Sequence, residues 1–248
     1  PSATSNPSFS LDRFLNAISH LTIPAIGQTK FINSILKSLA RGESVVIAGY
    51  AGLGKSIVAG NILKKFTDFH REYLFHYFKL PAHSDPPALI RSVLQELLIT
   101  HFPYTPESED INYLFNRIVA FMQKRTVFLF FDDANDSAAL EMILQFKNRL
   151  HNSIMLITSQ HENWLGLPSI SIQHIEGLGE TESLKLFQKY YKSPLNPGQL
   201  VHLQKFIQQV EGNPLLIECY AQECCASGFP TNDTILNNSI DRTWTELK

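Results

Sequence analysis

The sequence has no long apolar run and little net charge. No hydrophobic stretch approaches the roughly 20 residues that a transmembrane helix needs, so we expect no membrane span. The net charge of −2 gives no electrostatic argument for binding nucleic acid or a membrane surface. The N-terminus is polar and lacks the apolar segment of a signal peptide. Neither membranes nor nucleic acids are therefore expected as partners.

Cysteine is scarce, and its three copies, Cys219, Cys224 and Cys225, lie close together. An odd, clustered set makes a poor disulfide framework and indicates a reducing compartment, so we predict a cytoplasmic location. Three thiols would need a fourth ligand to hold zinc, and no histidine is near them in the sequence. We interpret them as ordinary helix thiols. Because the sequence begins at Pro1 rather than at methionine, we also expect a longer parent chain.

One stretch has the pattern of a phosphate-binding loop. Residues 49–56 read Gly-Tyr-Ala-Gly-Leu-Gly-Lys-Ser, which fits G-x-x-x-x-G-K-[ST], the P-loop. A β-branched apolar run precedes it at 44–48, and a segment with helical spacing follows at 56–66. Glycines let the backbone approach phosphate closely, and amides at a helix N-terminus favour anions. The predicted nucleotide-binding residues here are Gly49, Tyr50, Ala51, Gly52, Leu53, Gly54, Lys55, Ser56 and Ile57.

The same pattern assigns individual roles. Lys55 would neutralise the β- and γ-phosphates, and the Ser56 hydroxyl would complete a Mg²⁺ shell. A second apolar run, at 126–131, ends in Asp132-Asp133. Asp132 is predicted to hold Mg²⁺, as the acidic end of such a strand does in P-loop enzymes. Asp133 is a candidate general base for an attacking water, or alternatively a residue that only caps or turns the chain.

Hydrophobic periodicity predicts strands that alternate with helices. Strands are expected at 44–48, 73–78, 126–131, 153–158 and 169–172, with helices between them. This order predicts an α/β fold: a P-loop NTPase with a five-stranded, mainly parallel sheet flanked by helices. Beyond Gly177 only helical patterns appear, which indicates a small helical domain. We predict an N-terminal linker and short helix at 1–22, a P-loop nucleotide-binding domain at 23–176 and a helical domain at 177–248.

Five stretches, in order, resemble the NB-ARC class of STAND NTPases, which includes apoptosome-forming ATPases, plant immune receptors and bacterial signalling regulators. Residues 25–28, Ala-Ile-Gly-Gln, stand where the family has V-G-R-E, and the P-loop follows. Residues 130–134 are similar to its h-h-D-D-h segment, and residues 156–160 stand at its h-h-T-S-R. Residues 212–215, Gly-Asn-Pro-Leu, are similar to its G-x-P-L motif. The resemblance runs from about Ile23 to about Ala226.

The resemblance implies a signalling switch that binds ADP or ATP with Mg²⁺ between its two domains, and whose nucleotide state controls conformation and oligomerisation. Ile26 would line the adenine pocket, and Pro214 and Leu215 would close it. Gln160 stands at the position of the family's sensor arginine, and Gln28 replaces another arginine. Glutamine brings no charge to a phosphate, so we expect slow hydrolysis or none.

Other functions remain open. The two glutamines favour a nucleotide-binding scaffold or interaction module that does not hydrolyse. A ring ATPase of the AAA+ kind is a further alternative, but it calls for an arginine finger and an Asp-Glu pair, which Asp132-Asp133 fits less well. The resemblance also implies self-association or protein partners through flanking domains.

Overall fold

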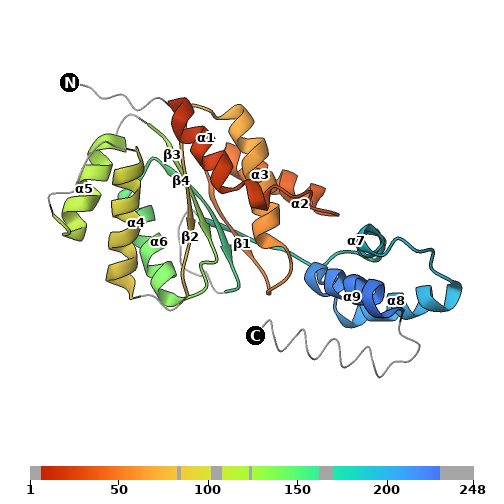
Figure 1. Ribbon diagram of the computed structural model, residues 1–248. Coiled ribbons are helices and arrows are strands. Elements are labelled where there is room, and N and C mark those ends of the chain that lie inside the picture. Colours follow the sequence, from red (N-terminus) through yellow and green to blue (C-terminus); the bar gives the residue numbers. More distant parts are fainter. Residues whose placement is uncertain (1–6, 83–84, 102–107, 123–124, 162–169, 230–248) are drawn as a thin grey trace.

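A five-stranded parallel sheet forms the centre of the computed structural model, which describes residues 7–82, 85–101, 108–122, 125–161 and 170–229 (Figure 1). The strand order is β2-β3-β4-β1-β5, and every neighbouring pair is parallel. The predicted fold class is confirmed. Parts of the predicted linker, fifth strand and helical domain (1–6, 169 and 230–248) lie outside the described residues. The strands are β1 (Ser44–Ala48), β2 (Leu74–Lys79), β3 (Val127–Asp132), β4 (Ser153–Ser159) and β5 (Ile170–His174).

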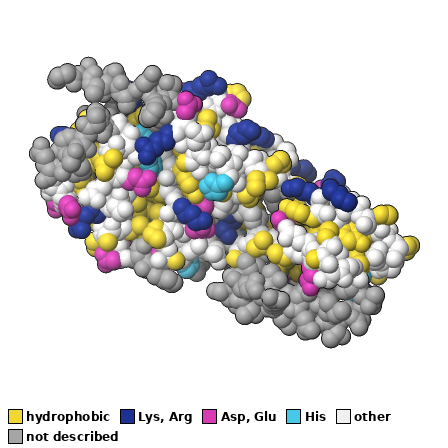
Figure 2. Space-filling view, in the orientation of Figure 1, with side chains coloured by type: hydrophobic (Ala, Val, Ile, Leu, Met, Phe, Trp, Pro, Cys, Tyr) yellow, Lys and Arg dark blue, Asp and Glu magenta, His cyan; other side chains and the backbone are white. Residues whose placement is uncertain are grey.

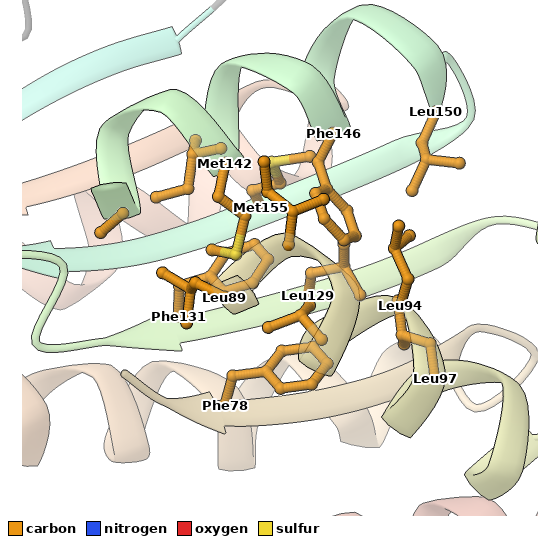
Figure 3. Close-up of a cluster of buried hydrophobic side chains, with 14 of the residues drawn as sticks. Phe78, Leu89, Leu94, Leu97, Leu129, Phe131, Met142, Phe146, Leu150 and Met155 are labelled. Atoms are coloured by element: carbon orange, nitrogen blue, oxygen red, sulfur yellow. The ribbon is translucent and has the colours of Figure 1, made fainter. Parts of the chain in front are cut away.

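Helices cover both faces of the sheet, and this explains why the strands read as continuous apolar runs. Successive side chains of a strand point to opposite faces. On β3, Phe128 and Phe130 belong to one buried cluster, while Leu129 and Phe131 belong to the other. The first face is covered by α1 (Pro7–Ala17), the 3₁₀ turn η1 (Ser19–Leu21), α2 (Thr29–Ala40) and α3 (Lys55–Phe69). The second is covered by α4 (Pro86–His101), α5 (Ile111–Met122) and α6 (Ser137–Arg149), as Figure 3 shows for part of that cluster.

The strand register brings the polar ends of three strands to one edge. Ala48 at the end of β1 pairs with Ser159 at the end of β4, and Phe131 of β3 pairs with Ile157 of β4. Lys79, the last residue of β2, pairs with Asp132, the last residue of β3. The P-loop follows β1, so it lies at the same edge as these polar residues. Ligands of open parallel sheets bind at this edge.

The remaining described elements are helices with a core of their own. These are α7 (Glu180–Tyr190), α8 (Pro197–Gln209) and α9 (Pro214–Ser227), which lie to one side of the sheet in Figure 1. Phe187, Phe206 and Tyr220 lie at the centre of their shared cluster. The backbone N–H of Leu178 donates to Gly212 O at 2.8 Å and ties the segment after β5 to the turn before α9. The predicted boundary near residue 176 remains a prediction.

The described residues include no helix with both the length and the apolarity that crossing a membrane requires. In the view of Figure 2, acidic and basic side chains lie among one another over the sheet part, without a single field of one sign.

Candidate functional site

A cavity of about 450 Å³ lies between the P-loop and helices α7 and α9. Its size is in the range of pockets that hold small molecules and cofactors. Residues from the segment before α2, from the P-loop and from both helices line it, so two parts of the chain share one site. Most residues predicted from the sequence meet here: Ile26, Ala51, Gly52, Leu53, Gly54, Lys55, Ser56, Ile57, Asp133, Gln160, Pro214 and Leu215.

Three predicted residues, Gly49, Tyr50 and Asp132, are not among the residues that line this cavity. The carbonyl oxygens of Gly49 and Tyr50 each accept a hydrogen bond from Lys55 Nζ at 2.8 Å. The Tyr50 side chain is 64% exposed and contributes no wall to the cavity. Asp132 lies behind Ser56, where it is almost fully buried.

The P-loop takes its shape from two glycines and one leucine. Gly52 and Gly54 have φ of +79° and +81°, a left-handed backbone that glycine adopts without strain. A Cβ on Gly52 would also lie only 2.7 Å from Asn213 Oδ1, so α9 approaches the loop too closely for a side chain. Leu53 packs into the core beneath the loop. The loop is therefore anchored below and contacted from above.

Burial lowers the pKa of Lys55 to about 8, and nearby Asp133 and Asp132 oppose this shift. The Lys55 side chain is buried beneath the loop, where the two carbonyls take the place of water. An anion in the cavity would favour the charged ammonium, since an opposite charge stabilises it. Lys55 is thus suited to bind a phosphate.

A hydrogen-bonded group at the carboxyl edge joins the ends of β3 and β4 to the first turn of α3. Asp132 Oδ1 accepts from Ser56 Oγ at 2.7 Å and from Thr158 Oγ1 at 2.6 Å. The sequence predicted that Ser56 and Asp132 act together, and they are in direct contact; Thr158 was not assigned a role. Hydroxyl and carboxylate oxygens are the ligands that Mg²⁺ prefers, so these residues fit the predicted ion. Burial, aided by Asp132 and Asp133, raises the pKa of neighbouring Tyr77 to about 12.

Asp133 has an unusual backbone and an ionic partner that the sequence did not reveal. Its φ of +63° is left-handed, which costs a non-glycine residue roughly 1–3 kcal/mol. Its N–H donates to Thr158 Oγ1 at 3.0 Å, and the next N–H, of Ala134, donates to Thr158 O at 2.9 Å. Its carboxylate lies 3.5 Å from Lys79 Nζ. The turn after β3 is therefore held firmly by β4.

Gln28 and Gln160, at the positions where the resemblance implies arginines, both line the cavity. The Gln160 N–H donates to Asn135 Oδ1 at 2.7 Å, which fixes the chain just beyond β4. Gln28 Nε2 donates to Glu176 O at 3.4 Å, a long bond. Both glutamine side chains therefore lie in the site, and neither can supply a positive charge to it.

Several lining residues come from the helical part and were not predicted. Leu178 and Leu186 add apolar wall, and Lys189, Tyr190 and Glu218 form a polar border. Burial and a hydrogen bond with Glu218 raise the pKa of Tyr190 to about 12. These residues belong to no motif, and their apolar neighbours have ordinary helical spacing. No local signal in the sequence could have identified them.

Comparisons with known proteins agree with this geometry. A family model described as the NB-ARC domain matches residues 28–193. No curated protein is matched by sequence. Among solved structures, a STAND protein with a tetratricopeptide repeat sensor from Pyrococcus horikoshii is 16% identical, with a TM-score of 0.54 over 87% of this chain. This chain spans only 32% of that protein.

Two further structures share the fold at still lower identity. The ORC1 protein of Aeropyrum pernix, solved in complex with DNA, is 11% identical with a TM-score of 0.59; the match covers 93% of this chain and 69% of that one. Cdc6p of Pyrobaculum aerophilum is 13% identical with a TM-score of 0.57, covering 84% and 66%. At these identities the likeness shows the fold alone.

Proposed function

The chain belongs to the NB-ARC family, and from that membership we propose that it is an adenine-nucleotide switch, the core of a STAND-type signalling protein. ADP bound between the P-loop part and the helical part would hold a resting arrangement. Exchange for ATP would change the relative orientation of the two parts and release surfaces for self-association. A ligand shifts such an equilibrium only if it contacts the two states differently.

The observation that carries the proposal is the shared cavity. Its floor is the P-loop, and its opposite wall is the start of α9. The two are bonded directly: the Leu215 N–H donates to Gly52 O at 3.3 Å, and Asn213 Nδ2 donates to Ala51 O at 3.0 Å. A nucleotide in this cavity would touch both parts at once. Its phosphates can therefore influence where the helical part sits.

The lining suits an adenine nucleotide with magnesium. Ile26, Leu186 and Pro214 offer apolar surfaces for a base, and Lys55 offers the charge for phosphates. Ser56 and Asp132 would hold Mg²⁺, which when bound neutralises charge on the phosphate oxygens. In this proposal Asp133, on the cavity wall, is the base that takes a proton from the attacking water.

A second candidate function is a nucleotide-binding scaffold that does not hydrolyse. The observation that favours it is the pair Gln28 and Gln160, both on the cavity wall where the resemblance leads us to expect arginines. An arginine contact to phosphate is charge-assisted and stronger than an amide contact. We therefore propose slow turnover for the switch, and the scaffold as its limiting case.

Sensing and output are assigned to regions beyond this chain. The similar Pyrococcus protein has a tetratricopeptide repeat sensor, and this chain spans about a third of it. We propose that the parent protein likewise couples this core to a sensor and an effector. A cytoplasmic location is part of the proposal, based on Cys219, Cys224 and Cys225, which form no disulfide.

The test is to denature the purified protein and identify the released nucleotide by chromatography. ADP would support the resting switch, and ATP that persists unhydrolysed would support the scaffold. A protein that releases nothing and takes up neither added ADP nor added ATP would refute both. Size-exclusion chromatography with light scattering, in ADP and in ATP, then tests self-association: the switch requires a larger species in ATP only.

A further inference from the structure

Lys79 belongs to no motif of the sequence, yet it lies at the carboxyl edge of the sheet, beside Asp132. It is the last residue of β2 and pairs in register with Asp132. Its Nζ lies 3.5 Å from Asp133 Oδ2. Among the described residues, Lys79 is the cation that forms an ion pair with the Asp133 carboxylate.

The backbone of Asp133 is fixed, so only its side chain is free to turn. Two hydrogen bonds to Thr158 hold the left-handed turn, one from Asp133 N–H and one from Ala134 N–H. The side chain lines the nucleotide cavity. It also interacts electrostatically with Lys55, on the P-loop side. The carboxylate thus lies under the influence of two lysines, Lys55 of the P-loop and Lys79 of the edge strand.

Lys79 lies outside the nucleotide cavity. It is not among the residues lining the nucleotide cavity, but lines a second cavity of about 290 Å³ between the end of β2 and α4. Asp85 and Glu96 line that second cavity as well, so it offers the Lys79 ammonium other carboxylates besides that of Asp133. The Lys79 and Asp133 side chains are 66% and 37% exposed, and exposed ion pairs are weak and reversible.

We propose that Lys79 is a positioning residue that holds the Asp133 carboxylate away from the attacking water and thereby keeps hydrolysis slow. The inference rests on the proposed function, since it needs ATP in the cavity. In the hydrolysis step, water oxygen bonds to the γ-phosphorus and the bond from that phosphorus to the β,γ-bridging oxygen breaks. The proton lost by water passes to Asp133, and ADP and inorganic phosphate leave. A carboxylate held toward Lys79 is misdirected for taking that proton.

The experiment measures single-turnover hydrolysis of Mg²⁺·ATP by wild type, Lys79→Gln, Lys79→Arg and the double variant Lys79→Gln with Asp133→Asn. Lys79→Gln should hydrolyse about two- to five-fold faster, the range expected for loss of an exposed ion pair. Lys79→Arg keeps the pair and should match wild type. The double variant should lose the gain, because the gain acts through Asp133. Lys65→Gln, an exposed lysine on α3, is the control that leaves turnover unchanged.

Binding of a fluorescent ADP analogue to each variant separates the two hypotheses. If every variant binds but Lys79→Gln turns over no faster than wild type, or shows no turnover, the role of Lys79 is refuted while the proposed binding function stands. A gain that persists without the Asp133 carboxylate also refutes it. A decrease in Lys79→Gln would mean that the ammonium acts on phosphate instead. If no protein binds nucleotide, the proposed function itself fails.

Discussion

The side-chain amide of Asn213 donates to the carbonyl oxygen of Ala51 at 3.0 Å and joins α9 to the P-loop across 162 residues of sequence. Its Oδ1 accepts the N–H groups of Leu215 and Leu216, at 3.1 and 3.3 Å, and so caps the helix. The side chain is almost fully buried, so water cannot replace these bonds. One residue therefore both starts α9 and fixes the loop below it.

Asn213→Asp should weaken nucleotide binding about tenfold. A carboxylate still accepts the two N–H groups that begin α9, so the cap survives. It cannot donate to Ala51 O, and it places a negative charge beside a carbonyl and a phosphate site. Leaving a buried acceptor unpaired costs about 1–3 kcal/mol. The measurement is titration of a fluorescent ADP analogue, with thermal unfolding recorded in parallel.

Asn196→Asp is the matched control for this prediction. Asn196 caps α8 by the same chemistry, accepting from the Gln199 N–H at 2.9 Å, but it makes no contact with the P-loop in the interactions of the described residues. The control should bind nucleotide as wild type does. Wild-type affinity in Asn213→Asp would show that the bond to Ala51 does not shape the loop.

The fold could be predicted because burial on both faces leaves a strong pattern in the sequence. Runs such as Val45-Val46-Ile47 and Phe128-Leu129-Phe130 have no polar side to interrupt them, so strands and their order relative to helices are readable. Their pairing was predicted only as mainly parallel. The order β2-β3-β4-β1-β5 depends on which strands become neighbours, and no single run carries that information.

The site was predictable where its residues follow one another and not where they meet across the fold. The P-loop residues and Asp132-Asp133 form local patterns, and the cavity contains most of them. Lys79 ends an aromatic strand that was read only as far as Phe78, and its partner lies 54 residues away. Asn213 followed by Pro214 has the pattern of a helix start. The bond from Asn213 to Ala51 leaves no such pattern in the sequence.

Lys55→Ala should abolish nucleotide retention, while Gln160→Ala should change it little. Among the residues of the recognised motifs, Lys55 is the one that brings a positive charge to the cavity. Gln160 offers an amide without charge, and its backbone bond to Asn135 does not need the side chain. Both variants are assayed for nucleotide carried through purification. Stoichiometric nucleotide in Lys55→Ala would refute the P-loop assignment.

Asp132→Asn should weaken binding of nucleotide with Mg²⁺ more than binding of ADP in EDTA. The amide keeps an oxygen that can accept from Ser56 and Thr158, but it loses the charge that attracts a divalent ion. The comparison is the ratio of Kd values with Mg²⁺ and with EDTA, in wild type and variant. Thr158→Val, which removes the hydroxyl that donates to Asp132 and accepts from the Asp133 N–H but changes no charge, serves as control. Equal losses in both buffers would argue against a metal role for Asp132.

The lowered pKa of Lys55 makes nucleotide binding depend on pH, with a definite sign. In the nucleotide-free protein the pKa is about 8, below the 10.5 of an exposed lysine, chiefly because of burial. The unfolded chain then holds this proton more tightly, so this group makes the free energy of unfolding rise with pH between about 8 and 10.5. Binding reverses the preference, because phosphate favours the ammonium.

We therefore expect the Kd for ADP to be nearly constant between pH 6.8 and about 7.5 and to rise above about pH 8, by up to about tenfold per pH unit. The nucleotide's own phosphates are already ionised in this range. Calorimetric titration in two buffers of different ionisation enthalpy should show proton uptake on binding at pH 9 and little at pH 7. Among the described residues, Lys147 is the other lysine whose pKa is lowered, and it lies against Ser44; Lys147→Gln should leave the profile unchanged. A flat profile to pH 9.5 without proton uptake would mean that Lys55 does not change its protonation when nucleotide binds.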